Sequence, residues 1–119
     1  MKVEEDFLAA LDLARRRKKP VWDAVCFHCQ QAAEKYLKAR MHEAGLTVRR
    51  THDLETLLND LLPFEPVWAA FRTALQDLSD FAVHFRYPGN RATKSQARRS
   101  ILDCRTVRRE VRLSLGLSA

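Results

Sequence analysis

The sequence predicts an all-α protein, an antiparallel up-and-down bundle of four to five helices. Only three of its 119 residues are Gly and four are Pro, while strong helix formers dominate the composition. Apolar residues recur at the helical period in several long segments, and short loops separate these segments. Because the composition never shifts as it would at a linker, and no internal repeat is visible, we expect a single domain over residues 1–119.

The first helix is predicted from about Glu4 to Lys18. It is expected to bury an apolar face made of Phe7, Leu8, Leu11 and Ala14. The basic run 15–19 lies at its end, before Pro20, which cannot continue a helix interior. Basic side chains there complement the negative end of the helix dipole, and a nucleic-acid patch is the alternative reading of the run.

The second helix is predicted to begin near Val21 and to stop at Gly45 as a left-handed cap, which makes it the longest element. One of its faces should be buried: Trp22, Val25, Cys26, Cys29, Ala32, Ala33, Tyr36, Leu37 and Met41. Its two cysteines and Cys104 are odd in number and lie in apolar helical patterns, so we expect reduced, buried thiols. A zinc knuckle at 26–29 is disfavoured because no second ligand pair occurs, and neither a metal nor a cofactor is predicted.

Three further helices are expected. The first of them starts at Thr51-His52-Asp53, ends at Pro63, and buries Leu54, Leu57, Leu58, Leu61 and Leu62. The next has Pro66 in its first turn, ends before Pro88, and buries Val67, Ala70, Phe71, Ala74, Leu75, Leu78 and Ala82. The last opens with a capping-box pattern at 93–96 and buries Ala97, Ile101, Cys104, Val107, Val111 and Leu115.

The charges of the chain are segregated beneath a formal net charge of +6. Seven basic residues face two acidic ones between Lys94 and Leu115, whereas six acidic residues face one basic residue between Asp53 and Asp80. Such a dipolar chain can bind a polyanion, a second copy or an acidic protein, and a merely solvated basic face is the alternative. No apolar run is long enough to span a membrane and the N-terminus lacks a secretion signal, so a cytoplasmic location is expected.

A polar line on the second helix is the first candidate binding site. His28, Gln31, Lys35 and Lys38 follow the edge of its buried face and place an imidazole, an amide and two amines in register. A satisfied, partly buried imidazole is the alternative role for His28, and His52 is expected to order the loop before the third helix.

Three short blocks occur along the chain: FHCQQAAEKYLKA at 27–39, Thr51-His52-Asp53-Leu54, and Arg86-Tyr87-Pro88-Gly89. In order and spacing they resemble the signature blocks of the HEPN domain family, and the resemblance covers nearly the whole chain. It implies a small helical bundle, commonly a homodimer, found in prokaryotes beside a minimal nucleotidyltransferase-type protein in toxin–antitoxin-like modules. Many HEPN proteins are metal-independent ribonucleases.

The ribonuclease branches of that family carry an Arg-x(4–6)-His motif, and this sequence has no Arg followed by a His at that distance. His84, Arg86 and Tyr87 offer a noncanonical alternative, since they supply a base, a cation and an acid for metal-free RNA cleavage. They would converge only if the helix unwinds before Pro88, and packing of the turn is the alternative role for these side chains.

Two functions therefore stand after the sequence analysis. The first is a homodimeric binding component that docks a nucleotidyltransferase-type partner and binds nucleotide or RNA, with phosphates near His28, Gln31, Lys35 and Arg86. The second is a metal-independent ribonuclease that uses His84, Arg86 and Tyr87. Four large aromatic residues predict a subunit interface: Trp22, Trp68, Phe81 and Phe85.

Overall fold

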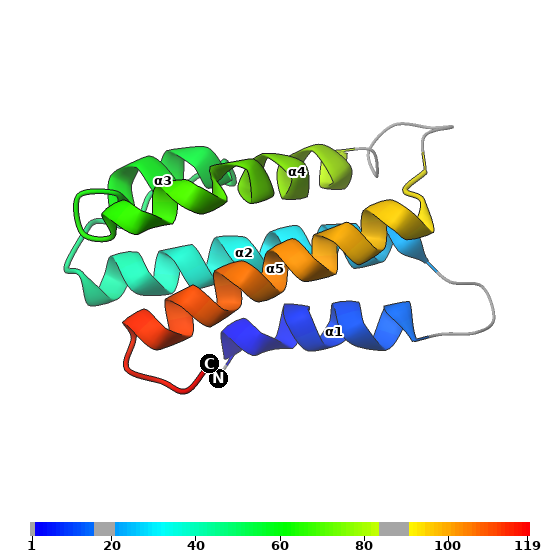
Figure 1. Ribbon diagram of the computed structural model, residues 1–119, viewed down its shortest axis with the longest axis horizontal. Helices are drawn as coiled ribbons and strands as arrows, with labels where there is room; N and C mark the ends of the chain where they lie inside the picture. The colour runs from blue at the N-terminus through cyan, green and yellow to red at the C-terminus, as the bar shows by residue number, and fades with distance from the viewer. Residues whose placement is uncertain (1, 16–20, 84–90) are drawn as a thin grey trace.

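The computed structural model describes residues 2–15, 21–83 and 91–119, and these residues form helices joined by loops, without strands (Figure 1). The elements are η1 (Lys2–Glu4), α1 (Glu5–Ala14), α2 (Trp22–Glu43), α3 (Leu54–Leu61), η2 (Pro66–Phe71), α4 (Arg72–Val83) and α5 (Lys94–Ser114). The predicted all-α bundle is confirmed. None of the described helices is long and apolar enough to cross a membrane.

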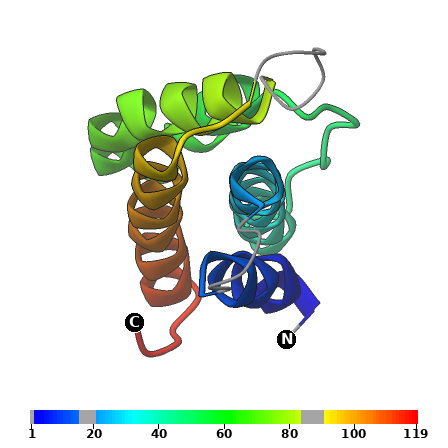
Figure 2. The same ribbon diagram turned by 90° about the vertical axis from the view of Figure 1, so that its right-hand side faces the viewer.

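The helices form three layers, with α3 and α4 on one side, α2 and α5 in the middle, and α1 on the other side (Figures 1 and 2). α1 and α4 run in one direction, and α2 and α5 run in the opposite direction (Figure 1). Contacts near both ends of α2 and α5 agree with this parallel orientation. Near the helix starts, the Ser100 hydroxyl donates to the Cys26 sulfur, and near the helix ends Arg40 and Ser114 share the Glu65 carboxylate.

The core is built around α2, as the sequence predicts. Eight of the nine residues predicted on its buried face are fully buried, and Trp22 is partly buried. The three cysteines are free and buried, which confirms the expectation of reduced thiols. Burial raises the pKa of Cys26, so this thiol stays protonated.

The helix ends follow their sequence signals. Gly45 has a φ of 74°, and the amides of Gly45 and Leu46 donate to the carbonyls of His42 and Met41, which is a Schellman motif. Asp53 caps α3 by accepting from the Glu55 amide. At the start of α5, Thr93 and Gln96 form the predicted capping box.

Two predicted details of the buried faces are wrong. Leu8 is 54% exposed, because α1 packs on α2 through Phe7 and Ala10 and turns Leu8 to solvent. The segment from Pro66 begins as a 3-10 helix instead of an α-helix, and this tighter winding changes which side chains face inward. Trp68 is 2% exposed as a result, whereas Val67 is 75% exposed and Ala70 also faces solvent.

The burial of Trp68 also contradicts its predicted role in an aromatic subunit interface. Trp68 packs against Phe71 inside the core and is not available to a subunit interface. Trp22 and Phe81 are partly buried against the core, and Phe85 lies outside the described residues. Six residues predicted as buried are partly buried at the edge of the core: Leu11, Ala14, Leu62, Ala74, Ile101 and Leu115.

One end of α1 is fastened to the C-terminal half of α5. The Glu4 carboxylate accepts from Arg108 at 3.0 Å and from Arg112 at 2.8 Å. The Arg108 guanidinium also lies over the Phe7 ring, 5.2 Å from its centroid. Burial alone would raise the pKa of Glu4, but hydrogen bonds from Arg108 and Arg112 hold it below the ordinary value of 4.5. We call Glu4, Phe7, Arg108 and Arg112 the clamp.

The 3-10 start of the fourth helical segment predicts opposite effects for two adjacent residues. Trp68→Ala should lower the free energy of unfolding by about 3–5 kcal/mol, because it leaves a cavity in the core. Val67→Ala should change it by less than about 0.5 kcal/mol, because Val67 is 75% exposed. Urea denaturation measures both, and a larger loss for Val67→Ala would support the α-helical register instead.

The clamp predicts a pH dependence of stability. Because the folded-state pKa of Glu4 is lowered, its contribution is present above the unfolded value and is lost as pH falls through the folded value. Glu4→Gln should therefore cost roughly 1–3 kcal/mol at neutral pH and much less in strong acid. Urea denaturation across this range is the measurement. Glu5→Gln is the control, since Glu5 is exposed and makes no ion pair with a described residue, and a pH-independent cost of Glu4→Gln would contradict the clamp.

Candidate functional site

Two members of the predicted polar line on α2, His28 and Lys35, face α1 and share one carboxylate there. Asp6 of α1 lies between them, with Oδ1 2.9 Å from His28 Nδ1 and Oδ2 2.5 Å from Lys35 Nζ. Burial alone would raise the pKa of Asp6, but Lys35 and His28 hold it below its ordinary value. The cationic character expected of this line is thus offset by Asp6.

The rest of the line belongs to a second polar network on α2. Gln31 donates to the Gln30 side chain, which in turn donates to the carbonyl of His52. Glu34 is 6% exposed and contacts both His52 Nδ1, at 2.7 Å, and Lys38 Nζ, at 3.2 Å. His52 therefore helps to order the loop before α3, and the buried amide and carboxylate of α2 are satisfied by partners.

The structure brings His28, Gln31 and Lys35 onto one side of α2, but their polar atoms contact protein partners. Arg86, the fourth residue predicted at that site, lies outside the described residues, as do His84 and Tyr87 of the alternative ribonuclease set. The nucleotide site on this line and the catalytic set thus stay predictions. In the described ranges, no group of three or more His, Cys, Asp or Glu residues is arranged to hold a metal ion.

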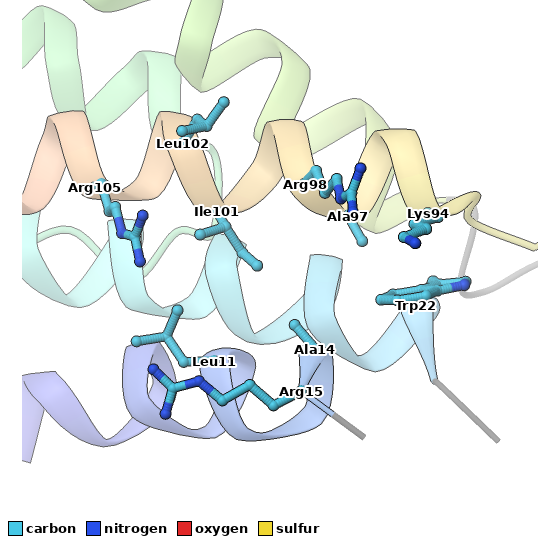
Figure 3. Close-up of a pocket in the computed structure, with 10 residues that line it drawn as sticks. All are labelled: Leu11, Ala14, Arg15, Trp22, Lys94, Ala97, Arg98, Ile101, Leu102 and Arg105. Atoms are coloured by element: carbon cyan, nitrogen blue, oxygen red, sulfur yellow. The ribbon is translucent and has the colours of Figure 1, made fainter. Parts of the chain in front are cut away.

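A groove with a cavity volume of about 690 Å³ lies between α1 and α5 and is bordered by basic residues (Figure 3). Its floor is apolar and its margins are basic. The apolar floor residues are Leu11, Ala14, Trp22, Ala97 and Ile101, and the basic residues are Arg15, Lys94, Arg98 and Arg105. Leu102, which is 58% exposed, lies at the outer edge of the α5 wall (Figure 3). We call this the α1–α5 groove.

The fold positions both walls of the groove. The clamp connects the start of α1 to the C-terminal half of α5. The groove therefore lies where the last turn of α1 faces the N-terminal half of α5. At the entry to α5, the Ala92 amide donates to the Asp23 carboxylate in the first turn of α2. Lys94 and Trp22 both line the groove and lie at the same end of it in Figure 3.

The side chains of α5 divide into two sets. Four arginines are engaged by carboxylates of the same chain: Arg99 with Asp77 and Asp103, Arg108 and Arg112 with Glu4, and Arg109 with Glu110. By contrast, none of the four basic residues of the groove lies within 4.0 Å of a carboxylate in the part of the chain that the structure describes. Their charge is therefore available to an external anion.

The spacing of basic residues in the last helix is a sequence signal for one wall of this groove. Lys94, Arg98 and Arg105 follow one line of the last helix at spacings of four and seven, with Ile101 and Leu102 between them. A basic line interrupted by aliphatic residues differs from an evenly solvated basic face. The facing wall could not be read from the sequence, because Arg15 belongs to a run that is also typical of a helix end.

The described lining of the α1–α5 groove is suited to binding an anion. It contains basic and apolar side chains, and neither a histidine nor a carboxylate is among the described lining residues. Four guanidinium or ammonium groups can contact phosphates or carboxylates, while the floor can accept an apolar group. The groove thus fits a ligand that is both anionic and partly apolar.

The chain was compared with protein families, curated proteins and solved structures. The family model of the HEPN domain matches residues 3–114. The searches of curated proteins and of solved structures find no match. Because the family model extends from the start of the chain to the last residue of α5, the protein belongs to the HEPN domain family.

Proposed function

We propose that this HEPN protein is a binding component, a homodimer that associates with a minimal nucleotidyltransferase-type protein and with nucleotide or RNA. The observation that carries the proposal is the α1–α5 groove, where four basic side chains without a carboxylate partner in the described structure surround an apolar floor. Nucleotides, RNA and acidic proteins are all anionic, so each can be attracted to this surface.

The division of the α5 arginines supports a binding role. An evenly solvated basic helix would leave its arginines equally available, but here four are engaged within the chain and the remaining basic residues gather in one groove. Such clustering raises the local positive potential more than the net charge of +6 alone does.

A homodimer is consistent with apolar residues elsewhere on the surface. Val67 is 75% exposed and Leu113 is 52% exposed, and both lie outside the α1–α5 groove. Val67 lines a surface hollow together with Trp68, Ala70 and Phe71, and a contiguous apolar patch of this kind is typical of a contact surface. Sedimentation velocity at micromolar concentration tests this part of the proposal, which a monomer would contradict.

Reversal of two charges in the groove should weaken the binding of single-stranded RNA. The probe is a labelled RNA of about 20 nucleotides, followed by fluorescence anisotropy. Arg98→Glu with Arg105→Glu should raise the dissociation constant at least about tenfold, because two phosphate contacts become repulsive. The slope of log affinity against log salt should also fall by about 1.4 for the two lost cations.

The matched control is Arg49→Glu with Arg50→Glu, which makes the same change in net charge in the exposed loop before α3, outside the groove. This variant should bind RNA within about twofold of the unmodified protein, as expected when only distant, screened charges change. Equal weakening by both double variants would contradict a localised site. Cleavage of the RNA in the presence of a chelator, abolished by His84→Ala, would instead support the ribonuclease alternative.

A further inference from the structure

We infer that the α1–α5 groove is the docking site for an acidic amphipathic helix of a partner protein. This inference rests on the proposed function and narrows its ligand from anions in general to one protein segment. The occupant has an apolar stripe that enters the groove and acidic side chains on both sides of that stripe. Recognition of a helix in a groove uses anchors at spacings of three, four and seven residues.

The floor of the groove is mainly aliphatic. Leu11 and Ala14 come from α1, and Ile101 comes from α5 with Leu102 at the outer edge of its wall, whereas Trp22 is the one aromatic residue among the lining residues that the structure describes. Single-stranded nucleic acid is usually held by several aromatic rings on which successive bases stack. Aliphatic floors are suited instead to leucine-type side chains, so the apolar chemistry favours a peptide over RNA.

The basic residues lie on both walls. Arg15 projects from α1, while Arg98 and Arg105 belong to α5 on the opposite side (Figure 3). An amphipathic helix that places its apolar stripe on the floor presents acidic residues to both walls at once. Rim charges of this kind set the orientation of the helix and raise its association rate.

The length of the groove suits a short helix. Along α5 it extends from Lys94 to Arg105, a separation of about 16 Å at the helical rise of 1.5 Å per residue. A partner helix of about three turns covers that distance with two or three apolar anchors. The exposed Leu8 lies about one turn before Leu11 on α1. It extends the apolar surface of the groove toward the start of α1.

A second copy of the chain does not match this groove face to face. If two copies packed their α1–α5 grooves together around a two-fold axis, the same basic side chains of both copies would meet. Like charges at an interface disfavour association. An acidic segment on a different protein has no such conflict. Charge complementarity therefore selects an acidic partner.

A synthetic peptide tests the inference on the full-length protein. The probe is a labelled peptide of about 14 residues with leucines at helical spacing and glutamates at the other positions, and its control is a scrambled peptide of the same composition. Fluorescence anisotropy should show the amphipathic peptide bound at least about fivefold more tightly than the scrambled one. Leu102→Gln should remove most of this difference, and Arg15→Glu should weaken binding from the opposite wall.

The control variant is Leu113→Gln, which makes the same substitution on the same helix at a residue 52% exposed, similar to the 58% of Leu102. It should leave peptide binding unchanged. Leu102→Gln should also leave RNA binding within about twofold, because RNA would use the cations without the apolar side chains. Circular dichroism verifies that each variant is folded.

Different results separate the failure of this inference from the failure of the proposed function. Equal binding of the two peptides, or an equal effect of Leu102→Gln and Leu113→Gln, would overturn the helix-docking inference. If RNA binding still depends on Arg98 and Arg105 in that case, the proposed function stands with RNA as the occupant of the groove. The loss of both dependences would overturn both.

Discussion

The burial of α2 is the constraint on which the rest of the structure depends. Ten of its residues are buried, including Gln30 and Glu34, whose polar atoms need partners once they leave water. The loop before α3 supplies those partners through His52, and α1 supplies Asp6 for the neighbouring His28 and Lys35. The polar line on α2 therefore forms hydrogen bonds and ion pairs with α1 and with the loop before α3. These contacts account for the polar residue types found along the line.

The same packing decides which cations remain available. Both α1 and α5 lie against α2, and the clamp joins them at one end only, so a space with an apolar floor opens at the other end. Arg108 and Arg112 connect α5 to Glu4. Arg98 and Arg105, about three turns and one turn before Arg108, border the opening. One helix thus carries both structural and binding charges, and the difference between them is the presence of a carboxylate on the facing element.

Much of the fold could be predicted because its signals are local. The stripe of α2, the cap at Gly45 and the capping box at Thr93 each depend on residues close in sequence, and all are confirmed. The expected positions of Trp68 and Leu8 are wrong, because their burial depends on helix winding and on the neighbour that each faces. The candidate site was harder to predict: the partners of His28 and Lys35 come from Asp6, and the walls of the groove come from two helices that are distant in sequence.

We propose that external ligands contact the α1–α5 groove, while the polar line on α2 joins that helix to its neighbours within the fold. The most direct measurement is the mapping of backbone amide shifts in two-dimensional NMR spectra of the ¹⁵N-labelled protein during titration with the acidic amphipathic peptide. The account predicts that the largest shifts fall on Leu11, Arg15 and the segment from Lys94 to Arg105. Largest shifts at His28, Gln31 and Lys35, with the groove unaffected, would contradict it.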